Sequence, residues 1–355
     1  MTATWSVHPA STFPGLVPRW QAGHAAACAP PFLDAAFMQP LLRHFGDDGL
    51  RVALCESAGQ AVAAALLRRD GTGRWTTWQP SQLPLGAWLT AQGADGFALA
   101  RQLLAQLPGL ALGLSLTQLD PRFQPRPGND ATLQMLDYID TAWVDVEGSF
   151  DAYWEARGKN LRTNMRKQRS KLDSEGIAPQ FDTLNTADAM PAALADYGRL
   201  ESAGWKAGGG TAVHPDNAQG RFYTEMMQAF CAQGRGRVCR LRFGDKVVAM
   251  DLCIEGGGTL VVLKTAFDPE YRNVSPAFLL KQDAFRQVFE EGRIRRIEFY
   301  GRLMEWHTRW TEQSRHLYHA NVYRWAWVPA LRERLRPRAK PQPAAEAVTQ
   351  DKAEG

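Results

Sequence analysis

The sequence lacks the features that would place it in or across a membrane. No stretch approaches the roughly 18 consecutive apolar residues that a membrane-spanning helix requires, so no transmembrane helix is expected. The opening residues, MTATWSVHPASTFPG, contain neither the basic nor the apolar segment of a secretion signal. The formal net charge is only +4, which is too small by itself to indicate a protein that binds DNA. These absences predict a cytoplasmic protein without a membrane span.

Cysteine is also scarce, and the common catalytic motifs are absent. No Gly-x-x-x-x-Gly-Lys-Ser/Thr loop is present, and no cysteine or serine stands in a nucleophile elbow. His214, His316 and His319 form no metal cluster with carboxylates at useful spacing. A metal-dependent or P-loop enzyme is therefore not expected. The five cysteines show no metal spacing and are interpreted as buried thiols in a reducing compartment: Cys28, Cys55, Cys231, Cys239 and Cys253.

A strand–turn–strand pattern occurs twice in a chain whose 355 residues suffice for two domains. Arg51–Leu67 and Arg237–Cys253 match in length, in turn position and in their Arg-Val start. Each is followed by a third strand, a helix and a further strand. The pattern predicts an α/β (α+β) protein of two similar halves, 1–146 and 147–331, each a mostly antiparallel mixed sheet flanked by helices. The basic, then Pro- and Ala-rich stretch 332–355 is predicted to be a disordered tail.

The second half contains a strand, a short polar loop and a helix with clear boundary signals. The strand Thr259–Phe267 is rich in β-branched residues. Ser275 is a candidate N-cap, Pro276 takes the first helical position and Gly292 ends the helix. Free N–H groups and the helix dipole attract anions at such an N-terminus, and Arg272 lies beside it. An anion site and an ordinary strand-to-helix connection are both compatible with this pattern.

Helical periodicity predicts which residues of this helix are buried. Ala277, Leu280, Ala284 and Val288 mark the buried face, whereas Lys281 is predicted on the opposite, exposed side with its polar neighbours. In the Pro- and Ala-rich first 45 residues the pattern predicts a single helix, Pro31–His44.

A strongly basic segment lies between the halves. Seven Lys and Arg residues occur within Arg157–Lys171, with no acidic residue among them. Leu161, Met165 and Leu172 mark the buried side of a helix that ends at Gly176. The basic face is compatible with nucleic-acid or acidic-membrane binding, with an ordinary solvated helix face, or with the path of an anionic ligand.

The order hairpin, strand, anion loop, helix and splayed strand resembles the GNAT acyltransferase fold. In that superfamily an Arg/Gln-x-x-Gly-x-Gly/Ala loop gives backbone N–H groups to the pyrophosphate of an acyl-coenzyme A (acyl-CoA). The corresponding loop here has serine for the first glycine and loses one N–H donor at its proline; it reads Arg272-Asn273-Val274-Ser275-Pro276-Ala277. The resemblance implies that Arg272, Asn273, Ser275 and Ala277 bind acetyl-CoA or another acyl-CoA as co-substrate, without a metal.

Further motifs are similar to those of the CelD/BcsL-type acetyltransferases, which are related to the FemAB peptidoglycan-bridge enzymes. The similarity covers roughly Phe150 to Tyr323, and the first half only by architecture. It implies tandem GNAT-like halves and an acceptor tied to an exopolysaccharide or cell-envelope precursor. The motifs are Leu161-Arg162 before the basic run, Glu201–Ala207 with Gly210-Thr211-Ala212 behind it, and Asp268–Tyr271 with Ser275-Pro276.

Acyl transfer from a thioester to an amine needs a base for the amine, a donor for the oxyanion and a proton for the thiolate. In the family a strand with an acidic residue leads into a glycine and then a Tyr-Lys-x-x-Trp element; here histidine takes the lysine position. Because imidazole titrates near neutrality, His307 is predicted as base or proton relay, or it packs between Trp306 and Trp310. Glu298 is predicted to orient His307 or to act through a water, unless it is a surface carboxylate. Tyr300 is predicted to protonate the thiolate, or else to belong to the core.

Three further residues are predicted to contact the substrate. Trp205 and Lys206 precede a run of glycines that suits a lid or acceptor loop. Asp251 lies in an otherwise apolar strand, on the face of Ala249 and Cys253, where a carboxylate needs solvent or a partner. It is predicted either to belong to the site or to pair with Lys264 across the hairpin.

These features predict an enzyme, an acyl-CoA-dependent N-acyltransferase and most simply an N-acetyltransferase. The acyl group would pass directly to an amine, without a covalent enzyme intermediate, on a small molecule or a glycan precursor. One alternative is a FemAB-like enzyme with an aminoacyl-tRNA donor, in which the basic segment contacts RNA. Another is a non-catalytic GNAT-like binding module.

Overall fold

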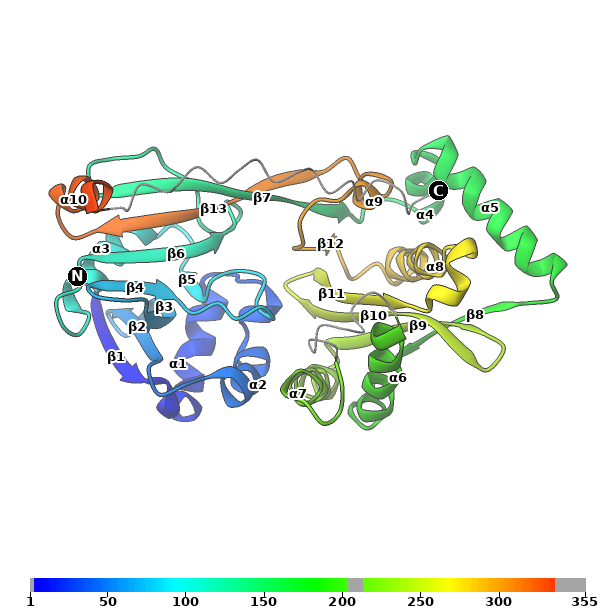
Figure 1. Cartoon of the computed structure of the whole chain (residues 1–355), viewed down its shortest axis with the longest axis horizontal. Helices are drawn as coiled ribbons and strands as arrows, with labels where there is room; N and C mark the ends of the chain where they lie inside the picture. The colour runs from blue at the N-terminus through cyan, green and yellow to red at the C-terminus, as the bar shows by residue number, and fades with distance from the viewer. Residues whose placement is uncertain (1–2, 204–212, 336–355) are drawn as a thin grey trace.

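The computed structural model describes residues 3–203 and 213–335. Two lobes lie side by side along the longest axis, the first half of the chain on the left in blue and cyan and the second in green and yellow (Figure 1). Both lobes combine a sheet with helices, which confirms the predicted α/β class with two similar halves.

The first lobe begins with a strand and two helices, of which the sequence pattern predicted only the second helix. The predicted helix Pro31–His44 starts later, because the side chain of Asp34 caps it by accepting a hydrogen bond from Ala36 N at 2.8 Å. The helix before it contains Pro14 and Pro18, so its amphipathic signal is weak. The elements are β1 Thr4–Pro9, α1 Phe13–Ala26, α2 Ala35–Phe45, β2 Arg51–Ser57, β3 Gln60–Arg69, β4 Arg74–Thr77, β5 Trp88–Thr90, α3 Gly96–Gln106, β6 Gly113–Leu119 and β7 Leu133–Asp145.

The second lobe repeats this order after a helical connection. The elements are α4 Phe150–Glu155, α5 Lys159–Ser174, β8 Pro179–Leu184, α6 Met190–Ala203, α7 Ala218–Ala232, β9 Gly236–Phe243, β10 Lys246–Gly256, β11 Thr259–Phe267, the 3₁₀ helix η5 Pro269–Val274, α8 Pro276–Glu291, β12 Arg296–Glu298, α9 Glu305–Thr308, β13 Ser314–Tyr323 and α10 Trp327–Leu335. The predicted hairpins are β2–β3 and β9–β10, and the helix predicted from the basic segment is α5, which buries Leu161, Met165 and Leu172 as expected.

One sheet runs through both lobes in the order β1-β2-β3-β4-β6-β13-β7-β12-β11-β10-β9-β8, with β5 paired to β3. The long strand β7 connects the lobes, because its first part pairs with β13 and its last three residues pair with β12. Strand β13 lies in the second range of the chain but pairs with β6 and β7, so it completes the sheet of the first lobe. The sheet therefore crosses the boundary proposed at 146/147. At the proposed boundary 331/332, α10 continues to Leu335, and residues 336–355 lie outside the described part.

Helix α8 packs on the second lobe's sheet, and two of its predicted details are wrong. Ser275 does precede the helix and Gly292 does end it, but Ser275 has a left-handed backbone, with φ of 49°, and its side chain makes no capping bond. Lys281, predicted on the exposed side, is 3% exposed. The apolar face is broad enough to enclose it, because Leu280, Ala284 and Val288 are buried together with Phe285 and Phe289.

Candidate functional site

The pocket with the geometry of an active site lies where β11 and β12 separate. The two strands pair in parallel over only three residues, from Thr259↔Arg296 to Val261↔Glu298, and β11 then continues to Phe267. A cavity of about 520 Å³ opens beyond the last pair. Backbone groups on diverging strands are available to a bound chain, since the neighbouring strand no longer uses them. The walls come from β11 (Val261–Thr265), the segment after β12 (Phe299–Gly301), α6 and α7 (Tyr197, Gln219 and Tyr223) and the first lobe (Ser81, Gln82 and Pro84).

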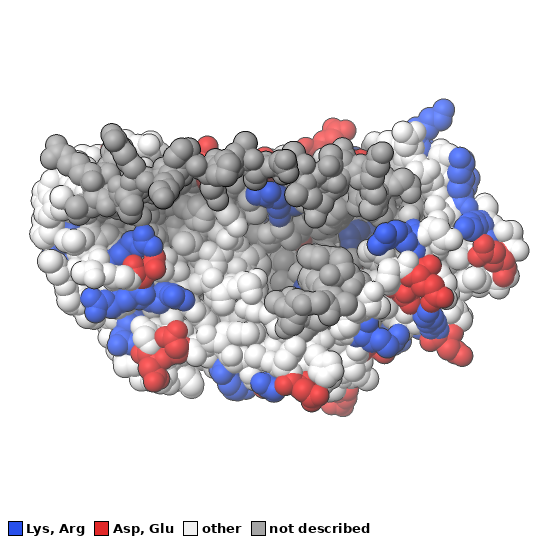
Figure 2. All heavy atoms as spheres, viewed as in Figure 1, with Lys and Arg blue, Asp and Glu red and all other residues white. Residues whose placement is uncertain are grey.

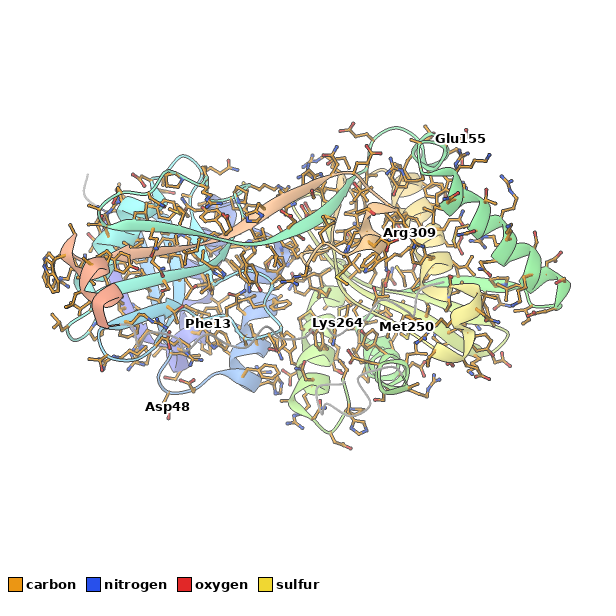
Figure 3. The ribbon with its side chains drawn as sticks, turned by 45° about the horizontal axis from the view of Figure 1, so that its top comes forward. Phe13, Asp48, Glu155, Met250, Lys264 and Arg309 are labelled. Carbon is orange, nitrogen blue, oxygen red and sulfur yellow. The ribbon has the colours of Figure 1, made fainter. Side chains whose placement is uncertain are left out.

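The second lobe's wall of this pocket combines one basic side chain with two phenols. Lys264 Nζ lies 2.8 Å from an oxygen of Glu201 and 5.2 Å from the ring centre of Tyr223. The other oxygen of Glu201 accepts a hydrogen bond from Val213 N at 2.7 Å, which holds the carboxylate. Burial raises the pKa of Tyr197 and of Tyr223, so both phenols stay neutral. Figure 3 places Lys264 near the middle of the molecule, on the side of the second lobe that faces the first.

The first lobe has the same strand arrangement, but its opening is closed. Strands β4 and β6 also pair in parallel over three residues, from Arg74 to Thr76. Beyond them Thr77 Oγ1 lies 2.8 Å from Thr117 Oγ1, and Gly86 N donates to Thr117 O at 3.0 Å. The chain between β4 and β5 thus fills the space that is open in the second lobe, and the cavity left there measures about 20 Å³. Of the two related openings, the one in the second lobe can admit a substrate.

The predicted donor residues gather at the N-terminus of α8, beyond the end of β11. Arg272 and Asn273 are exposed on η5, and Ser275 and Ala277 are half-buried. The N–H of Ser275 donates to Arg272 O at 3.0 Å, and Pro276 has no N–H to offer. This end of α8 therefore presents a helix dipole and an arginine, with fewer free N–H groups than a glycine loop would present.

Two of the predicted catalytic residues belong to a buried charged network at the junction of the lobes. Glu298 is fully buried and accepts hydrogen bonds from Arg315 Nη2 at 3.0 Å and Arg122 Nη1 at 3.2 Å. Tyr300 donates to Asp120 at 3.2 Å, and Arg315 reaches the same carboxylate at 2.6 Å. Burial raises the pKa of Glu298 although Arg315 opposes this, and burial raises the pKa of Tyr300 strongly.

This network fixes the shape of the pocket floor. Tyr300 lines the pocket and has a left-handed backbone, with φ of 50°, which is uncommon for a residue with a side chain. Its hydroxyl bond to Asp120 and the edge-on contact with Phe32 at 4.9 Å hold it there. Because Asp120 and Phe32 come from the first lobe, that lobe sets the position of a residue in the second lobe's pocket.

His307 is buried behind the pocket in a neutral state. Its Nδ1 accepts a hydrogen bond from Met304 N at 2.9 Å, so the proton of the neutral ring resides on Nε2. The ring stacks on Trp306 at 3.5 Å and meets Phe299, which lines the pocket, at 5.0 Å. Burial, with a smaller effect of Lys281, lowers the pKa of His307 to about 4. A ring in this state can donate a hydrogen bond but is a weak base at neutral pH.

Asp251 pairs with Lys281, so the predicted pairing with Lys264 is wrong. Lys281 Nζ lies 3.2 and 3.3 Å from the two carboxylate oxygens, and both side chains are buried. Thr265 of the pocket wall donates to Asp251 at 2.5 Å and accepts from Lys281 at 3.1 Å. Lys264 cannot reach Asp251, because neighbouring residues alternate between the faces of β11 and Lys264 points to the side of Glu201. Asp251 thus contacts Thr265 of the pocket wall but does not itself line the pocket.

Trp205 and Lys206 lie outside the described residues. The basic residues of the segment Arg157–Lys171 divide into two groups. Arg157 donates to Trp310 O at 2.9 Å, and Arg169 contacts Asp283 of α8 at 2.6 Å. Arg162 is half-buried and donates to Arg157 O at 3.1 Å. The other basic residues lie on the exposed side of α5, at the right-hand end of the molecule in Figure 2, where acidic side chains also lie. The exposed basic residues of α5 are Lys159, Arg166, Lys167 and Lys171.

Sequence reasoning missed the first lobe's share of the pocket and the role of Arg315. Arg315 belongs to β13, which was not predicted, and it joins Glu298 to Asp120. Gln82 and Asp120 reach the site from the first lobe, and nothing in their local sequence marks them. A signal did exist for Glu201, because it opens the Glu201–Ala207 motif, although its pairing with Lys264 was not anticipated.

The described residues contain no group of three His, Cys, Asp or Glu side chains placed to hold a metal ion. Within the same ranges no helix is both long and apolar enough to cross a membrane.

Parallel strands that separate beside a loop and a helix N-terminus are the arrangement that the resemblance to the GNAT fold predicted, and the comparisons with known proteins support that fold. Residues 159–308 match the family model described as "Acetyltransferase (GNAT) domain". A comparison with curated proteins found no match.

Solved structures with the same fold match almost the whole chain. FemX is 8% identical, with a TM-score of 0.57 over 89% of this chain and 98% of its own. A conserved protein of unknown function from Bacteroides thetaiotaomicron is 9% identical, with a TM-score of 0.54 over 91% and 100%. The C-terminal domain (DUF2156) from Agrobacterium fabrum, described as that of a lysylphosphatidylglycerol synthetase, is 15% identical, with a TM-score of 0.53 over 86% and 92%. At these identities the likeness shows the fold alone, including its two-lobed architecture.

Proposed function

We propose that this protein is an acyl-CoA-dependent N-acyltransferase, most simply an N-acetyltransferase, whose active site is the pocket between β11 and β12. The observation that carries the proposal is the separation of these strands beyond Val261 and Glu298, which opens a cavity of about 520 Å³ lined by β11, Phe299–Gly301, α6 and α7. The acyl-pantetheine arm would lie along the free edge of β11. The pyrophosphate would lie near Arg272, Asn273, Ser275 and Ala277, where the helix dipole favours negative charge.

In the proposed reaction the amine nitrogen attacks the thioester carbon directly. A new C–N bond forms, the C–S bond breaks, and the thiolate takes up the proton that the amine loses. Lys264 is the basic residue of the pocket wall, and we assign it to the oxyanion that develops on the carbonyl oxygen. Glu298 and Tyr300 act as positioning residues through Arg315 and Asp120, and His307 holds the aromatic wall formed by Phe299 and Trp306.

We propose that the acceptor is an amine on a polysaccharide or envelope precursor, such as an amino sugar. The resemblance of the Glu201 and Asp268 motifs to CelD/BcsL-type enzymes supports this, and so does the composition of the pocket. Phenols can stack on a sugar ring, while Ser81, Gln82 and Gln219 can bond to hydroxyl groups. Trp205 and Lys206 are retained as proposed acceptor contacts. A cytoplasmic location is part of the same proposal, because acyl-CoA is made there and the cysteines suit a reducing compartment.

Thermal unfolding with and without acetyl-CoA tests the donor. A ligand at about 100 times its dissociation constant adds roughly 2.7 kcal/mol to the free energy of unfolding. Arg272→Ala should remove most of this stabilisation, whereas Arg286→Ala, an exposed arginine further along α8 that pairs with Asp151, should keep it. The donor assignment is wrong if acetyl-, succinyl- and longer acyl-CoA at millimolar concentration all leave the unfolding temperature unchanged.

The exposed basic residues of α5 favour a second candidate, an aminoacyl-tRNA donor. If RNA binds there, affinity should fall steeply with salt, since each neutralised phosphate releases counterions. Filter binding with total tRNA at several NaCl concentrations measures this, and Arg166→Glu/Lys167→Glu should abolish it. Salt-dependent tRNA binding without any acyl-CoA effect would favour this donor. If neither donor binds, the chain is a GNAT-like binding module, an alternative that the engaged N–H of Ser275 and the neutral His307 also support.

A further inference from the structure

The C-terminal end of the described chain carries an apolar surface that no part of the proposed reaction uses. The rings of Trp325 and Trp327 stack, with centres 5.5 Å apart and planes inclined by 11°. Both remain exposed, at 41% and 53%, and Leu331 is 43% exposed. Leu110, in the loop before β6, is 66% exposed. Large apolar side chains gathered in this way at one end of a molecule usually mark a contact surface.

The geometry of α10 explains why these side chains project together. Trp327 and Leu331 are four residues apart, so they share one face of the helix. Val328 is 8% exposed and anchors the other face. The chain enters α10 from β13, where Arg324 N donates to Leu112 O at 2.9 Å. This bond brings the loop of Leu110 to the same end of the first lobe, the left-hand end in Figure 1. Together they form the C-terminal face, which consists of Leu110, Trp325, Trp327 and Leu331.

Basic residues lie beside the C-terminal face. Arg324 stacks on the ring of Trp325, with its guanidinium carbon 5.2 Å from the ring centre. Arg68 and Arg69 are exposed at the end of β3. Arg69 lies close to the loop of Leu110, because a Cβ added at Gly109 would lie 3.8 Å from Arg69 Nη2. The sequence then continues through 332–340, which contains five basic residues and one acidic residue. The apolar face is therefore bordered by positive charge.

We propose that the C-terminal face docks on an anionic lipid surface. Tryptophan, with an apolar ring and a polar N–H, prefers the boundary between water and hydrocarbon, and arginines beside it reach anionic headgroups. A short helix with an apolar face and basic flanks has the composition of an interfacial anchor. A lipid surface fits better than a protein partner, because four projecting side chains are a small area beside the ~1,600 Å² that a stable protein–protein interface buries. Docking would hold the enzyme at a membrane without crossing it.

Vesicle sedimentation of the full-length chain tests the proposal. Binding is expected to vesicles of phosphatidylcholine with about 30% phosphatidylglycerol, and not to phosphatidylcholine alone, because the arginines are attracted only by anionic headgroups. Trp325→Ser/Trp327→Ser should lower the partition coefficient roughly tenfold, because it removes the inserted rings. Raising NaCl from about 0.05 to about 0.5 M should also weaken binding, because the Debye length shortens.

A matched control is available on β7. Leu136 and Tyr138 are each 41% exposed, so Leu136→Ser/Tyr138→Ser removes a similar apolar area elsewhere and should leave binding unchanged. The variants' unfolding temperatures check that both remain folded. The proposal is overturned by equal binding to both vesicle types or by no binding to either. It is also overturned if Arg166→Glu/Lys167→Glu loses binding while the tryptophan variant keeps it. Concentration-dependent self-association that the tryptophan variant abolishes would instead assign the face to a second copy of the chain. Binding needs no donor or acceptor, so the outcome is independent of the proposed reaction.

Discussion

Lys281 of α8 and Asp251 of β10 form a buried ion pair behind the pocket, with the ammonium 3.2 and 3.3 Å from the two carboxylate oxygens. The exposed fractions of the two residues are 3% and 1%. Thr265 bonds to both, and the ring of Trp306 lies 5.2 Å from the ammonium. The pair therefore connects α8, the helix that begins at the proposed donor site, to β10, and through Thr265 to β11, the strand of the pocket wall.

Removing one member of this pair is expected to destabilise the protein strongly. Lys281→Met leaves the Asp251 carboxylate buried without its cation, which costs about 3–5 kcal/mol of unfolding free energy. Urea unfolding followed by circular dichroism measures the loss. Lys281→Met/Asp251→Leu, which removes both charges, should recover much of it. A single variant as stable as the wild type would show that the pair is open to water.

The buried state of His307 predicts a dependence of stability on pH. Its pKa is about 4 in the folded protein and 6.5 in the reference state, so the unfolded chain binds a proton that the folded chain does not in this range. The stabilisation is fully present above pH 6.5 and is lost as the pH falls toward 4. It amounts to at most about 3 kcal/mol. His307→Gln should reduce the difference between the free energies of unfolding that urea curves give at pH 4.5 and at pH 7.

Burial also lowers the pKa of His24 and of His319, so these residues too make the protein less stable at low pH. Their contribution is the same in the wild type and in His307→Gln. The comparison of wild type with His307→Gln therefore isolates His307. If the free energy of unfolding of His307→Gln fell between pH 7 and pH 4.5 by as much as that of the wild type, the assignment of a buried neutral ring would be contradicted.

Lys264 is expected to act on the transition state. Lys264→Gln should lower kcat for CoA release about 100-fold, the usual effect of removing one oxyanion donor, with little change in the KM for acyl-CoA. Lys167→Gln on exposed α5 is the control and should keep full activity. Because the substitution leaves Glu201 without its cation, Glu201→Gln/Lys264→Gln checks whether folding or chemistry is affected. An unchanged kcat would remove Lys264 from the mechanism.

Gly86 closes the opening of the first lobe and tolerates no side chain. A Cβ there would lie 2.3 Å from Thr117 O and 2.6 Å from Thr77 Oγ1. Gly86→Ala should cost about 1–3 kcal/mol through overpacking. Gly128→Ala, where no atom lies within 4 Å of the added Cβ, should be close to neutral. Thermal unfolding of the two variants distinguishes them, and similar unfolding temperatures would mean that the closed opening can relax.

Local patterns were sufficient to predict the hairpins and the helices with clear boundaries. The turn at Ala58-Gly59 and the alternation in β10 are short-range signals, and both appear in the structure. Strand β13 was not predicted, because its pairing with β6 and β7 joins residues about 170 to 210 positions apart along the chain. Lys281 was misplaced for a related reason, since a charged residue is assigned to the surface unless its partner on another element is known.

The candidate site was predictable in position but not in its connections. Glu298, Tyr300 and His307 were chosen by motif; Tyr300 lines the pocket, whereas Glu298 and His307 are buried behind its lining. Their actual contacts depend on Arg315, Asp120 and Met304, which neither periodicity nor spacing reveals. Their catalytic roles stay predictions for the experiments above.

The position of β13 has a consequence during synthesis of the chain. Until Tyr323 has left the ribosome, β6 and most of β7 each lack the neighbour that lies between them in the finished sheet. About 180 residues separate the end of β7 from the end of β13, so at 5–20 residues per second the two edges wait roughly 10–40 s. Unpaired edges of this kind recruit other strands. This protein is therefore expected to depend most on chaperones while the first lobe is complete but β13 has not yet been made. A gene fragment that stops at residue 146 should yield aggregated rather than folded protein.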